Sequence, residues 1–197
     1  MDEFTLRSRL SRRSARVAAV LLTAAGLTTP SLSPASAAPR QPAPEVWPRP
    51  QSTQTGPGRF TVPDRVVEVV GPNTDASARE VVETALREAG ADRIVRVDKP
   101  PASAAFTVYL DGPGTTAALK RLGARSPAGL PSGGYALASG RRDGRTVLAL
   151  SGSDATGTFY AAQTLRQLLS PSGKLPQVRI RDWPTAALRG VIEGFLL

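Results

Sequence analysis

Short runs of β-branched and other apolar residues, separated by turn-forming residues, recur from residue 66 to the end of the chain. Such runs are typical of β-strands, because branched side chains pack well on a pleated sheet. They predict strands at residues 66–70, 94–97, 106–110, 135–138, 146–150, 178–180 and 188–192. The polar tip Arg141-Arg142-Asp143-Gly144 separates the fourth and fifth of these, so we expect an antiparallel hairpin there.

Three other stretches carry apolar residues at helical spacing; they lie at residues 78–89, 118–122 and 161–169. The first is the clearest, because Ala, Val and Leu recur every three or four residues through its whole length. Asp75 or Ser77 is suited to cap its start, and Gly90 suits the left-handed position after its end. The third helix has Ser153 and Asp154 as candidate caps.

Strands alternate with helices, but the hairpin requires antiparallel pairing. The expected fold is therefore α/β (α+β), a mixed β-sheet with two or three helices mainly on one face, over residues 60–184. Residues 38–59 are rich in Pro, Gln, Ser, Thr and Gly, which predicts a Pro-rich linker. Within it we expect Trp47-Pro48 to dock on the domain, since an exposed tryptophan is unfavourable.

Residues 1–37 have the three-part pattern of a secretory signal peptide. Five arginines precede an apolar run at residues 17–27, and Ala35-Ser36-Ala37 offers small residues at a cleavage site. The apolar run is too short to span a bilayer. We therefore expect a secreted, extracellular protein with no membrane association beyond export. The pair Arg12-Arg13 leaves a twin-arginine route open beside the general one.

Charge and composition exclude several classes of function. The chain carries a net charge of +9, and about +6 remains beyond residue 37. These cations are mostly single arginines among acidic residues, so we expect a solvated basic surface and no nucleic-acid partner. The chain has no histidine and no cysteine. Ser-His-Asp and Cys-His catalysis and the usual zinc sites are therefore excluded, and we predict neither a metal nor a cofactor.

The residues that suggest chemistry each have a simpler interpretation. Gly112-Pro113-Gly114 lacks the spacing of a phosphate-binding loop and is read as a turn. Asp154 is read as a helix cap, and Phe159-Tyr160 as helix packing rather than a platform for sugar rings. Glycoside hydrolysis usually needs two carboxyl groups flanking one bond. Asp182 closes one predicted strand, and Glu193 lies in the next. Their spacing in the sequence alone does not bring the two carboxyl groups together.

Four segments resemble a known family. Residues 157–169 (GTFYAAQTLRQLL) and 178–184 (VRIRDWP) resemble the last helix and strand of the N-terminal domain that precedes bacterial β-N-acetylhexosaminidase barrels. Residues 47–51 (WPRPQ) are similar to the entry of that domain. The segment 189–195 (RGVIEGF) resembles the first barrel strand of glycoside hydrolase family 84, which comprises β-N-acetylglucosaminidases often labelled hyaluronidases.

The resemblance implies an accessory domain at residues 60–184, followed at 185–197 by the first strand of a truncated (β/α)8 barrel. It also implies that Gly194 lines the sugar pocket with its main chain, and that the partners are glycans containing N-acetylglucosamine, bound by the missing barrel. The family's catalytic residues are two adjacent aspartates later in the barrel. We predict no catalytic residue in this chain, which is expected to be inactive alone.

Two alternatives remain at this point. The chain is either part of such a glycosidase or a complete exported module that binds a glycan or another protein. A third interpretation is a non-functional gene product whose apolar segment at 191–197 favours aggregation.

Overall fold

The computed structural model describes residues 45–186, which form seven strands and three helices. In chain order the elements are β1 (Ser52–Thr61), β2 (Arg65–Val70), α1 (Ala76–Glu88), β3 (Arg93–Val97), β4 (Phe106–Leu110), α2 (Thr115–Arg121), β5 (Tyr135–Arg142), β6 (Arg145–Gly152), α3 (Ala155–Leu168) and β7 (Lys174–Asp182). The predicted signal peptide, the strand predicted at 188–192, Glu193 and Gly194 lie outside the described residues.

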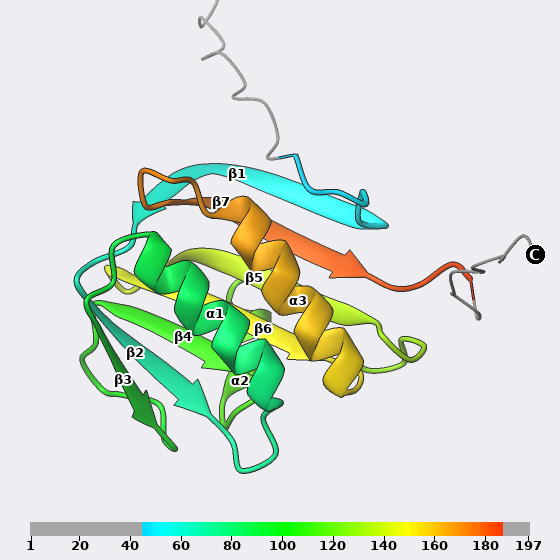
Figure 1. Ribbon diagram of the computed structural model, residues 1–197, viewed down its shortest axis with the longest axis horizontal. Helices are drawn as coiled ribbons and strands as arrows, with labels where there is room; N and C mark the ends of the chain where they lie inside the picture. The colour runs from blue at the N-terminus through cyan, green and yellow to red at the C-terminus, as the bar shows by residue number, and fades with distance from the viewer. Residues whose placement is uncertain (1–44, 187–197) are drawn as a thin grey trace, which may run out of the picture. The chain divides into compact units, whose positions relative to one another are not determined.

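All seven strands belong to one mixed sheet, in the order β1-β7-β5-β6-β4-β2-β3 (Figure 1). The half formed by β6, β4, β2 and β3 is parallel, and the half formed by β1, β7, β5 and β6 is antiparallel. The hairpin predicted around Asp143 and Gly144 is confirmed, with Arg142 paired to Arg145 at its tip. The prediction of a mixed sheet is therefore correct.

The helices lie on both faces of this sheet, two on one side and one on the other. Helices α1 and α3 run side by side across one face, and α2 lies against the opposite face (Figure 1). The expectation of helices mainly on one face is thus confirmed. The short α2 covers only part of its face, chiefly the small residues Ala136, Ala138 and Ala149 of β5 and β6.

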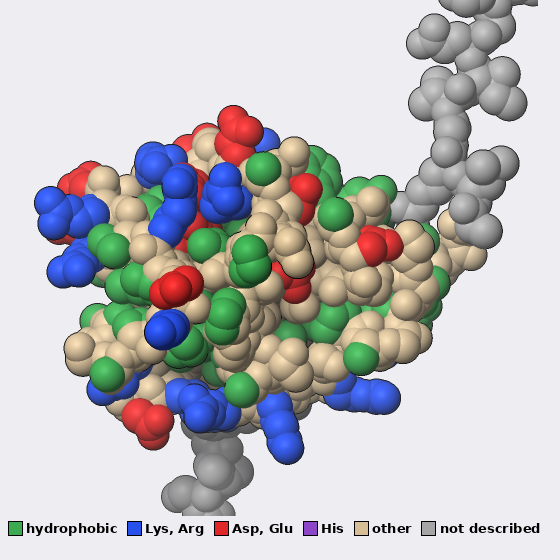
Figure 2. Space-filling view, turned by 90° about the horizontal axis from the view of Figure 1, so that it is seen from below, with side chains coloured by type: hydrophobic (Ala, Val, Ile, Leu, Met, Phe, Trp, Pro, Cys, Tyr) green, Lys and Arg blue, Asp and Glu red, His purple; other side chains and the backbone are tan. Residues whose placement is uncertain are grey.

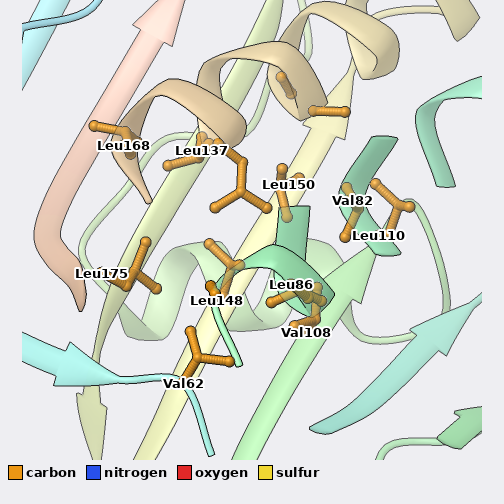
Figure 3. Packing of buried hydrophobic residues seen from close by; sticks show 14 of the residues in the cluster. Val62, Val82, Leu86, Val108, Leu110, Leu137, Leu148, Leu150, Leu168 and Leu175 are labelled. Atoms are coloured by element: carbon orange, nitrogen blue, oxygen red, sulfur yellow. The ribbon is translucent and has the colours of Figure 1, made fainter. Parts of the chain in front are cut away.

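The larger core lies between the sheet and the α1–α3 layer. Leu137, Leu148 and Leu150 extend from β5 and β6 toward Leu86 of α1 and Leu168 of α3 (Figure 3). Removing this much apolar surface from water is the main stabilising contribution to such a domain. No helix within residues 45–186 has the length and apolar character needed to cross a bilayer.

The structure differs from the predicted linker at residues 52–59, which form most of β1. Its partners are residues of β7, with Ser52 opposite Arg181 and Thr61 opposite Lys174. The register shifts between Thr55 and Arg59, and this irregularity contains the Gly-Pro-Gly segment. Proline is tolerated there because β1 is an edge strand and the residue sits in a bulge. The polar composition reflects exposure at the edge rather than a lack of structure.

The ends of α1 follow the sequence predictions. Of the two candidate caps, the side chain of Asp75 accepts a hydrogen bond from the Ala78 amide at 2.7 Å. Gly90, just past the helix, has a φ of 105°, which a residue with a side chain rarely adopts. A side-chain cap and a terminal glycine thus fix the limits of this helix in the sequence.

Candidate functional site

A cavity of about 330 Å³ opens beside α3, where the first and last described segments of the domain meet. The segment around Trp47 forms one wall, and the end of β7 with Trp183 and Pro184 forms another. Tyr160 and Gln163 of α3 contribute a third side. The cavity therefore combines aromatic and polar side chains from three parts of the chain.

Trp47 is held at this cavity by its main chain. Its amide donates to Oε1 of Gln167 at 2.8 Å, and Nε2 of Gln167 donates to the Trp47 carbonyl at 2.9 Å. The expected docking of Trp47-Pro48 is thus observed for the backbone, and the peptide bond between the two is cis. The expected burial is wrong, because 64% of Trp47 remains exposed. Among residues 45–186, Trp47 is the one large hydrophobic residue that is exposed.

Each tryptophan at the cavity is accompanied by an arginine. The Arg49 guanidinium carbon lies 5.8 Å from the Trp47 ring centroid, and that of Arg181 lies 5.8 Å from the Trp183 ring. Cations at this separation are attracted by the negative face of the aromatic ring. Arginine over tryptophan also presents a flat, partly apolar surface, the kind of side chain pair enriched where proteins bind one another.

The polar groups of the cavity have internal partners. Asp182, the last residue of β7, accepts a hydrogen bond from the Gln51 amide at 2.9 Å, which ties the start of the domain to its end. The Tyr135 hydroxyl lies 2.7 Å from Oγ1 of Thr164. Burial raises the pKa of Tyr135, so the phenol stays neutral and serves in packing.

The candidate residues from the sequence are dispersed over the domain. Asp182 lies at the cavity, and Tyr160 both packs on the core and lines the cavity. Asp154 caps α3, as predicted, accepting from the Gly157 amide at 2.8 Å. Hydrogen bonds from Ser132 and from backbone amides hold the pKa of Asp154 below its ordinary value. The segment 112–114 forms the predicted turn before α2.

Sequence reasoning missed Glu68, a wholly buried carboxylate in the centre of β2. Neither of its oxygens has a hydrogen-bond partner among the described residues, and Arg96 Nε lies 3.8 Å from Oε2. The same Arg96 nitrogen donates to Oε1 of Glu83 at 2.6 Å. Burial, followed by the Glu83 carboxylate, raises the pKa of Glu68 from 4.5 to about 7. In the sequence, only the position of Glu68 between two pairs of valines indicated that its carboxylate would be buried.

The exposed tryptophan and polar side chains of the cavity suit binding. Asp182 is the one carboxylate among its lining residues, whereas glycoside hydrolysis by the usual route needs two. An exposed aromatic ring held by a rigid backbone is instead typical of residues that anchor an interface. The cavity and the exposed Trp47 side chain are together called the Trp47 surface below.

The domain described above is similar to domains of known glycoside hydrolases. A family model described as "Glycosyl hydrolase family 20, domain 2" matches residues 43–183. The structure titled "Structure of CpGH84B" is 24% identical with a TM-score of 0.60, covering 78% of this chain and 25% of its own. That of CpGH84D is 16% identical with a TM-score of 0.64, covering 77% and 26%.

A further solved structure, titled as a glycoside hydrolase family 20 β-N-acetylglucosaminidase, is 25% identical with a TM-score of 0.46. The match covers 76% of this chain and 22% of that structure's chain. The chain thus spans about a quarter of the length of the solved proteins it matches. The shared part is the α/β domain described above, in agreement with the resemblance seen in residues 157–184.

Proposed function

The chain belongs to the glycosyl hydrolase family 20 domain 2 family, and we propose that it is the accessory domain of an exported β-N-acetylglucosaminidase. The observation that carries this proposal is the family match over residues 43–183, that is, nearly all of the described structure. In this proposal the substrate, a glycan containing N-acetylglucosamine, is bound and cleaved by a catalytic barrel, to which residues 185–197 and Gly194 would contribute.

The Trp47 surface is the part of the domain that suits contact with a catalytic domain. It lies beside Pro184 and Thr185, and so at the point where the chain leaves the sheet. It also offers an exposed tryptophan whose backbone is fixed at two points by Gln167. Tryptophan anchors of this kind contribute most of the affinity in many interfaces, because a large rigid ring is desolvated at little cost in conformational entropy.

We expect Trp47→Ala to weaken association with a family 84 catalytic domain that was produced without its own N-terminal domain. Loss of a central tryptophan anchor typically costs about 2 kcal/mol or more, so the dissociation constant should rise at least about thirtyfold. Isothermal titration calorimetry measures this change. Because the Trp47 ring is mostly exposed, circular dichroism and thermal unfolding of the variant should match the parent.

Arg145→Gln is the matched control, since Arg145 is exposed on the hairpin tip and does not line the Trp47 surface. It should leave the association unchanged. Equal affinities of the parent and Trp47→Ala would contradict the proposed role of Trp47. Tight binding of chitin oligomers that Trp47→Ala abolishes would instead favour the alternative of a glycan-binding module, which the aromatic lining of the cavity supports.

Export is a further part of the proposal. The basic, apolar and small-residue regions of residues 1–37 support it. N-terminal sequencing of the protein recovered from the medium should begin at Ala38. Protein retained in the cytoplasm with Met1 intact would contradict export.

A further inference from the structure

The face of the sheet that carries α2 is rich in arginine. Its cations come from α2, from the loop after it, from the β5–β6 hairpin and from β7, and they are Lys120, Arg121, Arg125, Arg142, Arg145, Arg179 and Arg181. Asp143 at the hairpin tip is the acidic residue beside them. Figure 2 shows Lys and Arg side chains spaced along the lowest edge of the molecule in that view. We call these seven residues the α2-face cations.

Two shallow hollows lie on this face, one on either side of the end of α2. The first, of about 150 Å³, is lined by Ala118 and Arg121 of α2 and by Arg142, Asp143 and Arg145 of the hairpin. The second, of about 160 Å³, is lined by the loop after α2 together with Arg125, Arg179 and Arg181. Each hollow therefore has three arginines among its lining residues.

Asp143 offsets part of the positive charge of the first hollow, and the lining residues of the second hollow include no acidic side chain. Within residues 45–186, the acidic partners in the ion pairs closer than 4 Å are Glu68 of β2 and Glu83 of α1, which lie away from the α2 face. On the α2 face the arginines meet neutral groups instead. Arg142 Nε donates to the Arg121 carbonyl at 2.6 Å, and Arg181 Nε donates to that of Ser126 at 3.2 Å. These bonds fix the side chains while leaving their charge available to an anion.

We propose that the α2-face cations bind an acidic polysaccharide, whose carboxylate or sulfate groups occupy the two arginine-lined hollows. Six of the seven cations are arginines, and the planar guanidinium matches carboxylate and sulfate oxygens with two parallel hydrogen bonds. A chain of sugars crossing the end of α2 would place successive acidic groups in both hollows. The choice of a glycan rests on the proposed function. The binding surface differs from the Trp47 surface and meets it at Arg181, whose guanidinium also lies over Trp183.

Other polyanions fit this face less well. Single-stranded nucleic acids are held largely by stacking on aromatic side chains. Tyr109, the aromatic side chain that lines the first hollow, is partly buried and packed on the small core under α2. Insertion into a membrane surface needs exposed large apolar side chains, and the one exposed among described residues, Trp47, belongs to the other surface.

Titration of the full chain with a size-defined chondroitin sulfate oligosaccharide tests this inference. We expect binding that weakens steeply with salt, because each contact releases counterions. The double variant Arg125→Gln/Arg145→Gln removes one exposed guanidinium from each hollow, and neither side chain has a hydrogen-bond partner in the described structure. Its dissociation constant should rise by about tenfold or more.

The control double variant Arg87→Gln/Arg166→Gln removes the same charge from α1 and α3 on the opposite face and should change affinity less than about twofold. Trp47→Ala should bind like the parent, which separates this surface from the proposed contact with a catalytic domain. Three results would overturn the inference: no binding of the oligosaccharide, an equal loss in the control variant, or tighter binding of a DNA duplex of matched charge.

Discussion

Replacing Gly157 with alanine is expected to lower the free energy of unfolding by about 3 kcal/mol, because the added methyl group has no room. Gly157 lies in the first turn of α3, against the ends of β5 and β6. A Cβ atom there would overlap the Gly134 carbonyl oxygen and lie 3.0 Å from its carbon and 3.2 Å from the Gly152 Cα. All three are backbone atoms, so no side-chain rotation relieves the contact.

The Gly134 carbonyl is also held in place, because it accepts a hydrogen bond from the Ser153 amide at 2.7 Å. Moving it away would break this bond at the start of α3. Chemical denaturation of the parent and the variant measures the effect, with Thr156→Ala as the control at the adjacent exposed position. We expect the control to change stability by less than about 0.5 kcal/mol. A Gly157→Ala protein as stable as the parent would contradict this packing.

Glu68→Gln is expected to stabilise the domain at pH 8 by about 2 to 3 kcal/mol relative to the parent, but to have little effect at pH 5. The pKa of Glu68 is raised to about 7 in the folded protein, against 4.5 for the free side chain. Between these pH values the folded state holds a proton that the unfolded state has released. Stability conferred by the protonated side chain is therefore lost as the pH rises through this window.

The amide of glutamine resembles the protonated carboxyl group in shape and carries no charge, so the variant lacks this loss. The Arg96, Arg79 and Arg87 side chains remain paired with Glu83 in the variant. Urea unfolding at pH 5 and pH 8 gives the difference in stability between parent and variant at each pH. Glu80→Gln, at an exposed position of α1, should show no such dependence on pH. A parent that is more stable than Glu68→Gln at pH 8 would refute the assignment.

The regular elements were predictable because their side chains follow the period of the structure they adopt. The stripe from Ala78 to Leu86 lies buried against the sheet, and the short β-branched runs became β2 and β4. Asp154 was predictable as a cap, since an aspartate before a helix satisfies free backbone amides. Local rules decided each of these features.

The features that were not predictable depend on contacts distant in sequence. Strand β1 is polar and contains proline, and it is a strand only because β7 provides hydrogen-bond partners for it. Trp47 is held by Gln167, 120 residues away, so its exposure could not be read from the neighbouring prolines. The two arginine hollows likewise combine α2, the hairpin and β7, segments that look like scattered single charges in the sequence.

Sequencing the genomic DNA that follows the codon for Leu197 tests whether this domain serves a β-N-acetylglucosaminidase. We expect a reading frame there to encode the remainder of a glycoside hydrolase barrel, including a pair of adjacent aspartates. Unrelated coding sequence, with no glycoside hydrolase barrel in any frame, would contradict the claim and would favour an independent binding module.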